Sequence, residues 1–310
     1  MKRRGVFISI AIVIIVVTTS LTIMNKKSSG KFAAASGADE HESKSADWKP
    51  IEQIFNRKGT LDNSVFKVTF PREDLKVTVG EVLVEPDLAL TSWIAFQPVK
   101  GRTMMMGDLV LLHQELPSVL SQLTKTNIEV TAIHNHLTME SPPIIYVHFE
   151  GMGNAADMAE QMKSVLSVTN TPLTTSPPAQ TKSREWSKVE NILTKKGTAK
   201  GNLIGFSIPR EENIHEMDTN IRPAMGVATA INFQAVGDKA ATTGDFVLIA
   251  DEVPAIQRTL TENGIRVTAI HNHMLHESPK LIFLHFWGYG DPEKLAKGLK
   301  AAIDKTNVKK

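Results

Sequence analysis

The sequence predicts an α+β protein made of two tandem homologous domains, each with a mostly antiparallel sheet and helices on one face. The first observation is an internal repeat, because the segment Val130–His136 recurs letter for letter as Val267–His273. Over the longer stretches Val130–Phe149 and Val267–Phe286, 13 of 20 positions are identical. The second observation is a common order of apolar periods, which at the end of each copy indicates strand, helix, strand, strand and helix.

Shorter motifs recur in the same order and extend the repeat over both copies. They are Trp48 with Trp186, Gly59 with Gly197, Pro71-Arg-Glu with Pro209-Arg-Glu, Phe96-Gln97 with Phe233-Gln234, and Gly107-Asp108 with Gly244-Asp245. We therefore expect repeat domains at 47–169 and 184–310. The Pro-, Thr- and Ser-rich residues 170–183 are the expected linker.

The elements of each copy follow from their periodicity. Helical spacing at Ile51, Ile54 and Phe55 predicts a first helix that ends near Gly59. In the first copy the predicted strands are 65–70, 75–84, 93–99, 108–112, 129–137 and 144–149, and the predicted helices are 116–125 and the segment that carries Met158, Met162, Val165 and Leu166. The last helix of the second copy is expected to begin with Asp291 as its N-cap and Pro292 as its first residue.

Composition excludes several classes of function. The chain has 310 residues with 35 Lys and Arg against 33 Asp and Glu, so it lacks the basic excess on which nucleic-acid binding depends. It contains no cysteine, which excludes disulfides, thiolate metal sites, cysteine nucleophiles and a lipoprotein anchor. It also contains no Gly-x-Ser-x-Gly, phosphate-loop or dinucleotide motif.

The N-terminus resembles a targeting segment. Lys2, Arg3 and Arg4 precede the apolar run Val6–Met24, which is long enough to span a hydrocarbon core. We expect a signal anchor at 1–24 and a flexible stalk at 25–46, with the domains outside the cytoplasm on a single-pass membrane protein. The alternative is a cleaved signal peptide with its cleavage site near the three alanines at 33–35, and the chain is exported in either case.

Histidines at repeat-equivalent positions are the candidate site. Residues i and i+2 of a strand share a face, so His134 and His136 are expected to project together, with His148 opposite His134 on the next strand. Glu140, in the connection, would then close over them. The expected metal ligands are His134, His136, Glu140 and His148 in the first copy and His271, His273, Glu277 and His285 in the second. Three imidazoles and one carboxylate suit Zn, Mn, Fe or Ni.

The spacing His-x-His-x-x-x-Glu, at 134–140 and 271–277, resembles the first metal motif of cupins. The likeness ends there, because the third histidine follows on the very next predicted strand and because the predicted helices do not suit a jelly roll. The metal chemistry is therefore retained and the cupin fold is not.

The wider pattern resembles the LppY/LpqO family of exported bacterial proteins and lipoproteins of uncharacterised function. The likeness rests on Pro-Arg-Glu, Gly-Asp before an apolar strand, Ala-Ile-His-Asn-His, Glu-Ser-Pro and the histidine of the closing strand, all present in both copies. It covers nearly all of 47–170 and 184–304. It implies export and a shared site at the histidines, and it supplies no reaction.

The leading functional hypothesis is a membrane-tethered extracytoplasmic binding protein with two His-rich sites for a divalent metal or a metal-chelated ligand. One alternative is a metal-dependent hydrolase or lyase that acts on cell-envelope material, with Glu140 or Glu277 as the general base. A second alternative is a scaffold whose histidines are structural. Asp108 and Asp245 are interpreted as turn residues, and Arg72 and Arg210 as members of inter-strand ion pairs.

Overall fold

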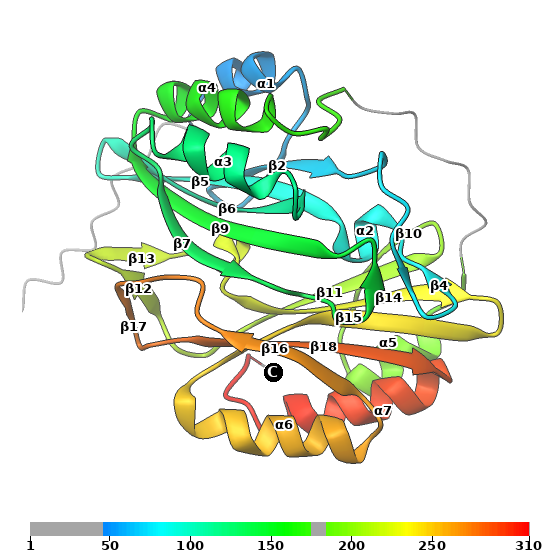
Figure 1. The fold of residues 1–310 in the computed structure, drawn as a ribbon. Coiled ribbons are helices and arrows are strands. Elements are labelled where there is room, and N and C mark those ends of the chain that lie inside the picture. Colours follow the sequence, from blue (N-terminus) through cyan, green and yellow to red (C-terminus); the bar gives the residue numbers. More distant parts are fainter. Residues whose placement is uncertain (1–45, 175–183, 310) are drawn as a thin grey trace, which may run out of the picture. The chain divides into compact units, whose positions relative to one another are not determined.

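The computed structural model describes residues 46–174 and 184–309, and both repeats fold as antiparallel sheets with helices (Figure 1). The predicted anchor at 1–24, nearly all of the predicted stalk at 25–46 and most of the predicted linker at 170–183 lie outside these residues. Among the helices of the described ranges, none has the length and apolar character that a membrane span requires.

The first repeat is a six-stranded sheet. Its elements in chain order are α1 (Lys49–Phe55), β1 (Thr60–Asp62), β2 (Val65–Pro71), β3 (Thr78–Val79), β4 (Val82–Leu83), α2 (Pro86–Ala89), β5 (Thr91–Val99), β6 (Arg102–Leu112), α3 (Leu116–Leu123), β7 (Glu129–His134), β8 (Glu140–Ser141), β9 (Ile144–Gly153) and α4 (Ala155–Leu166). The strand order is β1-β2-β5-β6-β9-β7, and every neighbouring pair is antiparallel. The short strands β4, β3 and β8 form a separate small sheet.

The second repeat follows the same plan. Its elements are α5 (Ser187–Leu193), β10 (Thr198–Lys200), β11 (Leu203–Pro209), β12 (Ile214–Glu216), β13 (Thr219–Ile221), η1 (Pro223–Met225), β14 (Ala228–Val236), β15 (Lys239–Leu248), η2 (Ala250–Glu252), α6 (Val253–Glu262), β16 (Arg266–His271), β17 (Glu277–Ser278), β18 (Ile282–Gly290) and α7 (Pro292–Ile303). The sheet order β10-β11-β14-β15-β18-β16 matches that of the first repeat strand for strand. The predicted α+β class with two repeated domains is confirmed.

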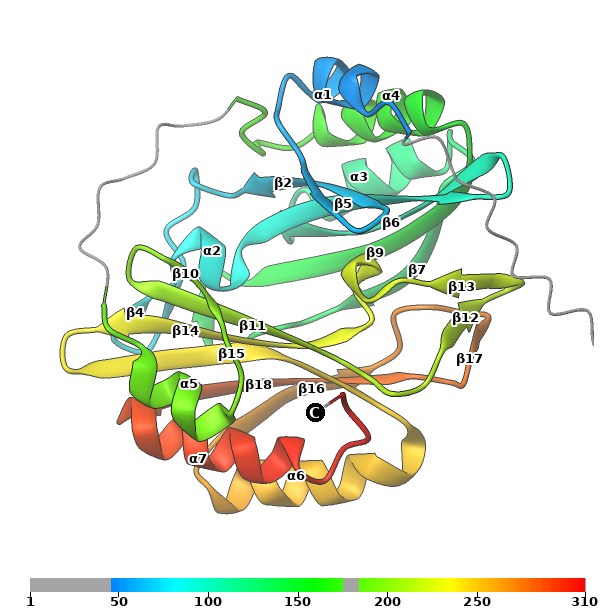
Figure 2. The same ribbon diagram turned by 180° about the vertical axis from the view of Figure 1, so that it is seen from behind.

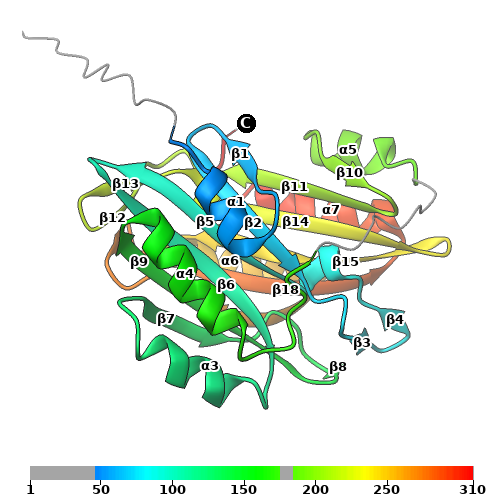
Figure 3. The ribbon, with the colours of Figure 1, turned by 90° about the horizontal axis from the view of Figure 1, so that it is seen from above.

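Helices cover one face of each sheet, which is the outer face of its repeat. In the first repeat Phe66, Val68 and Phe70 of β2 pack with Val147 and Phe149 of β9 in a core closed by α1, α3 and α4 (Figure 3). In the second repeat α5, α6 and α7 cover the corresponding face (Figure 2). Period-two alternation therefore sends every second strand residue into a helix-covered core and the others to the opposite, inner face.

The inner faces of the two sheets meet each other. Two apolar clusters contain residues of both repeats, one that joins Ile144 and Tyr146 to Trp287 and one that joins Met106 to Phe283. These contacts bury the inner apolar rows that a single repeat would leave in water.

A reciprocal set of hydrogen bonds fixes this arrangement. The Gln97 side chain bonds the main chain of the second repeat at Asn220 and Arg222, at 2.7 and 2.9 Å. Gln234 makes the matching bonds, at 2.8 and 2.9 Å, to the main chain at the end of β4 and immediately before α2. The repeated Phe-Gln motif thus supplies contacts between the repeats.

One predicted strand is wrong. Residues 75–84 do not form a single strand, because the chain reverses at Gly80, whose φ of 59° lies in the left-handed region that glycine adopts without steric cost. The segment instead gives the small hairpin of β3 and β4. β7 is also shorter than predicted, since it ends at His134 and leaves His136 beyond the strand.

The Pro-Arg-Glu motif supports the fold through a buried ion-pair network. The fully buried Arg72 contacts the carboxylates of Asp74 and Glu115 at 2.8 and 2.9 Å, and it also donates to the Val110 carbonyl. Arg210 repeats this with its own two glutamates and a strand carbonyl in the second repeat. Both arginines form ion pairs as predicted, but their acidic partners lie outside the strands, so the pairs are not inter-strand. Glu115 is itself buried by the network.

Substituting Arg72 tests how far the fold depends on this network. Because Arg72→Leu leaves Glu115 buried without its partner, we expect the free energy of unfolding to fall by about 3–5 kcal/mol in urea denaturation. As a control, Lys58→Met removes an exposed ion pair with Glu52 and should change stability by less than about 0.5 kcal/mol. Equal, small effects of the two substitutions would contradict this assignment.

Candidate metal centre

Strand pairing brings an aspartate and a histidine side by side in each repeat. Asp108 of β6 lies opposite His148 of β9, and Asp245 of β15 lies opposite His285 of β18. The predicted pairing of His134 with His148 is wrong, because Ala132 lies opposite His148 and His134 lies opposite Tyr146. A shift of two residues keeps the same face, so His134 still projects to the same side as His148.

The histidines of the two repeats form one cluster, whereas the sequence predicts one site in each repeat. The His134 and His271 rings, which are repeat-equivalent, lie with their centroids 4.0 Å apart. The ring centroids of His136 and His285 lie 4.0 Å apart, and those of the equivalent pair, His273 and His148, lie 4.6 Å apart. Equivalent contacts across the interface indicate an approximate twofold relation, as in a symmetric dimer.

Two groups of side chains have ligand atoms close enough to share an ion. The first contains His134, His271, His273 and His285, one nitrogen from each, all within 4.8 Å of one another. The second contains Asp108, His134 and His136 within the same limit. His134 belongs to both groups and lies at the centre of the cluster.

Hydrogen bonds fix which nitrogens carry a free lone pair. His271 Nδ1 donates to the Asn272 carbonyl at 3.0 Å, and His285 Nδ1 donates to the Gly244 carbonyl at 3.1 Å. Each imidazole therefore presents Nε2 as an acceptor, and both Nε2 atoms are buried without a hydrogen-bond partner.

The other rings of the cluster add to these unsatisfied atoms. Both nitrogens of His134, both nitrogens of His273 and Nε2 of His136 are likewise buried without a partner. His136 Nε2 lies 3.2 Å from Asp108 Oδ2, yet the orientation is not that of a hydrogen bond. His148 is the exception, since its Nδ1 hydrogen-bonds with Thr131 Oγ1 at 3.0 Å.

Burial keeps these imidazoles neutral. It lowers the pKa of His134 to about 2 and the pKa of His148 to about 4. Burial also lowers the pKa of His136, His273 and His285 well below the ordinary value, and neighbouring histidines add to the effect. A neutral imidazole is the form that ligates a metal.

The two predicted glutamate ligands begin the short strands β8 and β17 and lie outside the ligand groups. Glu140 accepts a hydrogen bond from the Ile144 main chain at 3.3 Å, and Glu277 accepts one from Leu281 at 3.1 Å. Neither carboxylate belongs to the groups that have the spacing for a metal. The Glu-Ser-Pro motif thus shapes the turn between two strands in both repeats.

Asp108 and Asp245, interpreted from the sequence as turn residues, instead lie in the interior of strands at the cluster. Asp108 is 3% exposed, and burial with the nearby Asp108 charge raises the pKa of Asp245 to about 7. The glycine before each aspartate is required by close packing, since a Cβ at Gly107 would clash with Phe149 and a Cβ at Gly244 with the Ala230 carbonyl. The recurrence of Gly-Asp in both copies was the sequence signal for these residues.

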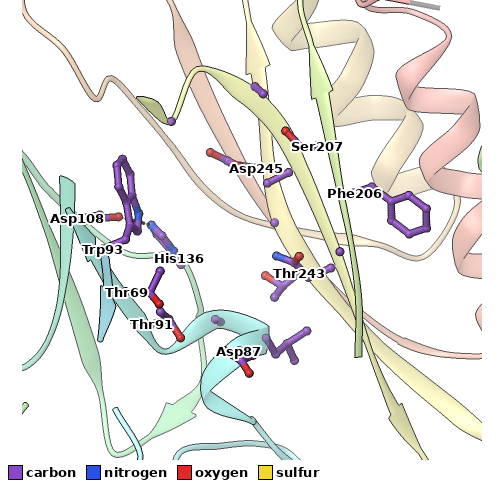
Figure 4. Close-up of a pocket in the computed structure, with 18 of the residues that line it drawn as sticks. Thr69, Asp87, Thr91, Trp93, Asp108, His136, Phe206, Ser207, Thr243 and Asp245 are labelled. Carbon is purple, nitrogen blue, oxygen red and sulfur yellow. Dashed lines mark ion pairs between the residues drawn. The ribbon is translucent and has the colours of Figure 1, made fainter. Parts of the chain in front are cut away.

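A cavity of about 510 Å³ borders the cluster (Figure 4). Asp108 and His136 face it from the first repeat and Asp245 from the second, and His273 and His285 also line it. The cavity gives a small molecule access to the histidines.

Acidification should destabilise the metal-free protein. The folded-state pKa of each cluster histidine lies below the unfolded value of about 6.5, so at lower pH the unfolded chain binds protons that the folded chain does not. All six cluster histidines thus lower the stability of the fold on acidification. The raised pKa values of Glu150, Glu216 and Asp245 have the opposite effect on stability. We expect the free energy of unfolding to decrease from pH 6.5 to pH 4.5 by about 1.4 kcal/mol per pH unit for each net proton.

Urea denaturation at several pH values measures this slope. His285→Asn should reduce it, whereas His113→Asn, at an exposed histidine, should leave it unchanged. A stability that is constant or rises on acidification over this range would contradict the neutral state of the cluster.

Comparisons with known proteins identify a family for this chain. One family model, described as Domain of Unknown Function (DUF1259), matches residues 49–168 and again 187–305.

Among solved structures, the chain is similar to a trimeric bacterial microcompartment shell protein, PduB, at 12% identity over 80% of this chain and 89% of that chain, with a TM-score of 0.21. It is similar to TP0453 at 14% identity over 82% of this chain and 97% of that chain, with a TM-score of 0.19. Neither TM-score establishes a shared fold, and a comparison with curated proteins finds no match.

Because the family model covers both repeats and most of the chain, the protein belongs to the family described as Domain of Unknown Function (DUF1259), with two copies in tandem.

Proposed function

We propose that the protein binds a divalent transition metal at a single centre to which both repeats contribute. The ligands are His134, His271, His273 and His285, with Asp108 and His136 beside them as a second group that shares His134. The observation that carries the proposal is the set of seven buried ring nitrogens that lack a hydrogen-bond partner and lie in one cluster.

The energetics favour an ion over a purely structural role. A buried polar atom left without a hydrogen-bond partner costs about 1–3 kcal/mol of stability. Seven such atoms in a purely structural scaffold would therefore destabilise the fold. An ion held by the four-histidine group would satisfy one nitrogen of each ring. Imidazole ligands suit Zn, Fe or Ni, and the carboxylate of Asp108 extends the range to Mn.

A metal-dependent hydrolase or lyase is the second candidate function. The observation in its favour is the cavity, which gives a substrate access to His273 and His285. Glu140 and Glu277 do not border this cavity, so the general base in this version is Asp108 or Asp245.

The cellular setting is part of the same proposal. The likeness to LppY/LpqO proteins and the apolar segment 6–24 support export, with a membrane tether and a small-molecule or cell-envelope ligand as partner. No basic excess supports a nucleic-acid partner.

Metal content tests the central proposal. The full-length protein, expressed with Zn, Mn, Fe and Ni and analysed by plasma mass spectrometry, should carry one ion in the four-histidine group. His273→Ala should abolish binding because it removes a ligand, whereas Glu277→Gln and the exposed His276→Ala should retain it. Metal-free protein under all conditions, with no thermal stabilisation by added ions, would refute the metal site.

The tether has its own test. An uncleaved anchor predicts that the membrane-bound protein starts at its encoded N-terminus and resists extraction with salt. A soluble species that starts near Ser36 would show that the segment is a cleaved signal peptide.

A further inference from the structure

The cavity arises where the two repeats differ. Its wall in the first repeat carries Lys67 and Trp93, while the equivalent positions of the second repeat are Gly205 and Ala230, and all four residues line it. Figure 4 shows Trp93 and His136 on one side of the cavity and Asp245 and Thr243 on the other. Two large side chains of the first repeat thus stand where the second repeat has two minimal ones, and the smaller residues leave space in the cavity.

The second repeat also keeps its main chain close to Trp93. Gly226 has a φ of 95°, and a Cβ there would lie 2.8 Å from the Trp93 ring. The aromatic ring is therefore held against the main chain, and it gives the cavity a rigid apolar wall.

Lys67 places a cation in this cavity. It alternates with Phe66 and Val68 along β2, so its side chain points to the inner face while theirs enter the helix-covered core. Its Nζ lies 4.4 Å from the Trp93 ring centroid. Within the described residues no carboxylate pairs with it directly, although the charges of Asp62 and Asp245 act on it from beyond ion-pair distance. Burial lowers the pKa of Lys67 to about 8, so the amine is still largely protonated at neutral pH.

The charge of the cavity depends on the metal. Asp108 and Asp245 face it together with Lys67, whereas Asp87 is already paired with Lys200. Without an ion, two carboxyl groups oppose one ammonium group and disfavour an anion. A divalent ion reverses this balance, because it adds two positive charges beside the same groups.

We infer that the cavity binds a small molecule that carries an oxyanion, which pairs with the Lys67 ammonium group once the metal site is loaded. The apolar part of the molecule lies against Trp93, and the volume of about 510 Å³ suits a ligand of a few hundred daltons. This inference rests on the proposed metal site and names the chemical class of its ligand.

Calorimetric titration of the metal-loaded, full-length protein with inorganic phosphate and with succinate tests the inference, and the two arms distinguish phosphate from carboxylate ligands. We expect at least one of them to bind and to quench tryptophan fluorescence through Trp93. Binding should weaken roughly tenfold or more in Lys67→Met and in the metal-free protein, because each loses a charged partner of the anion. Lys67→Arg should restore part of the affinity, and Lys58→Met, at an exposed lysine, should match the unchanged protein.

The outcomes separate this inference from the proposed function. Metal content is measured on every variant, and Lys67→Met should keep its ion. A loaded protein that binds neither anion, or that binds equally well as Lys67→Met or without metal, overturns the oxyanion site and leaves the metal site standing. A protein that takes up no metal overturns the proposed function itself.

Discussion

Burial of the two inner sheet faces against each other is the constraint on which the site depends. Each sheet has one face covered by its own helices, and the other face carries a mixed row of apolar residues, histidines and an aspartate. That mixed row is shielded from solvent only when the other repeat covers it. The same contact that supplies hydrophobic stabilisation therefore removes solvent from the imidazoles and keeps them uncharged.

Much of the fold could be predicted from the sequence because its signals are local. The alternation in residues 144–149 predicts that Val147 and Phe149 enter the core and that His148 lies on the opposite face, and in the structure both apolar residues belong to the helix-covered core. The N-cap at Asp291, which accepts a hydrogen bond from Lys294 N, was likewise predictable from local sequence. Such features depend on a few neighbouring residues and can therefore be read directly from the sequence.

The assembly of the site was less accessible, for a physical reason. A period of two shows that a strand face is buried but not what covers it. Each histidine set was therefore expected to be completed by a glutamate of its own repeat. Asp108 was missed because Gly-Asp is common in turns, and only the pairing of β6 with β9 places it beside His148. The register of β7 on β9 includes a bulge and pairs His134 with Tyr146, and residue spacing alone does not reveal this register.

Tandem duplication has a consequence for how such a site diverges. In a homodimer every substitution appears twice about the twofold axis, so a bulky cation on one wall is matched by another on the facing wall. In a single chain the copies change independently, and Lys67 can stand in one copy where the other has Gly205. The asymmetric cavity is a property that a symmetric assembly of one repeat does not have.

The reciprocal hydrogen bonds of Gln97 and Gln234 have a further consequence for assembly. Each glutamine holds a segment of the other repeat, so neither half of the centre is complete until both repeats have docked. In separate subunits this docking would be bimolecular, and the fraction of complete sites would fall on dilution. Joined in one chain, the halves meet at an effective concentration set by the connecting segment. Ligand binding at this centre is therefore first order in the protein, and it remains so at the low copy numbers at which a dimer would dissociate.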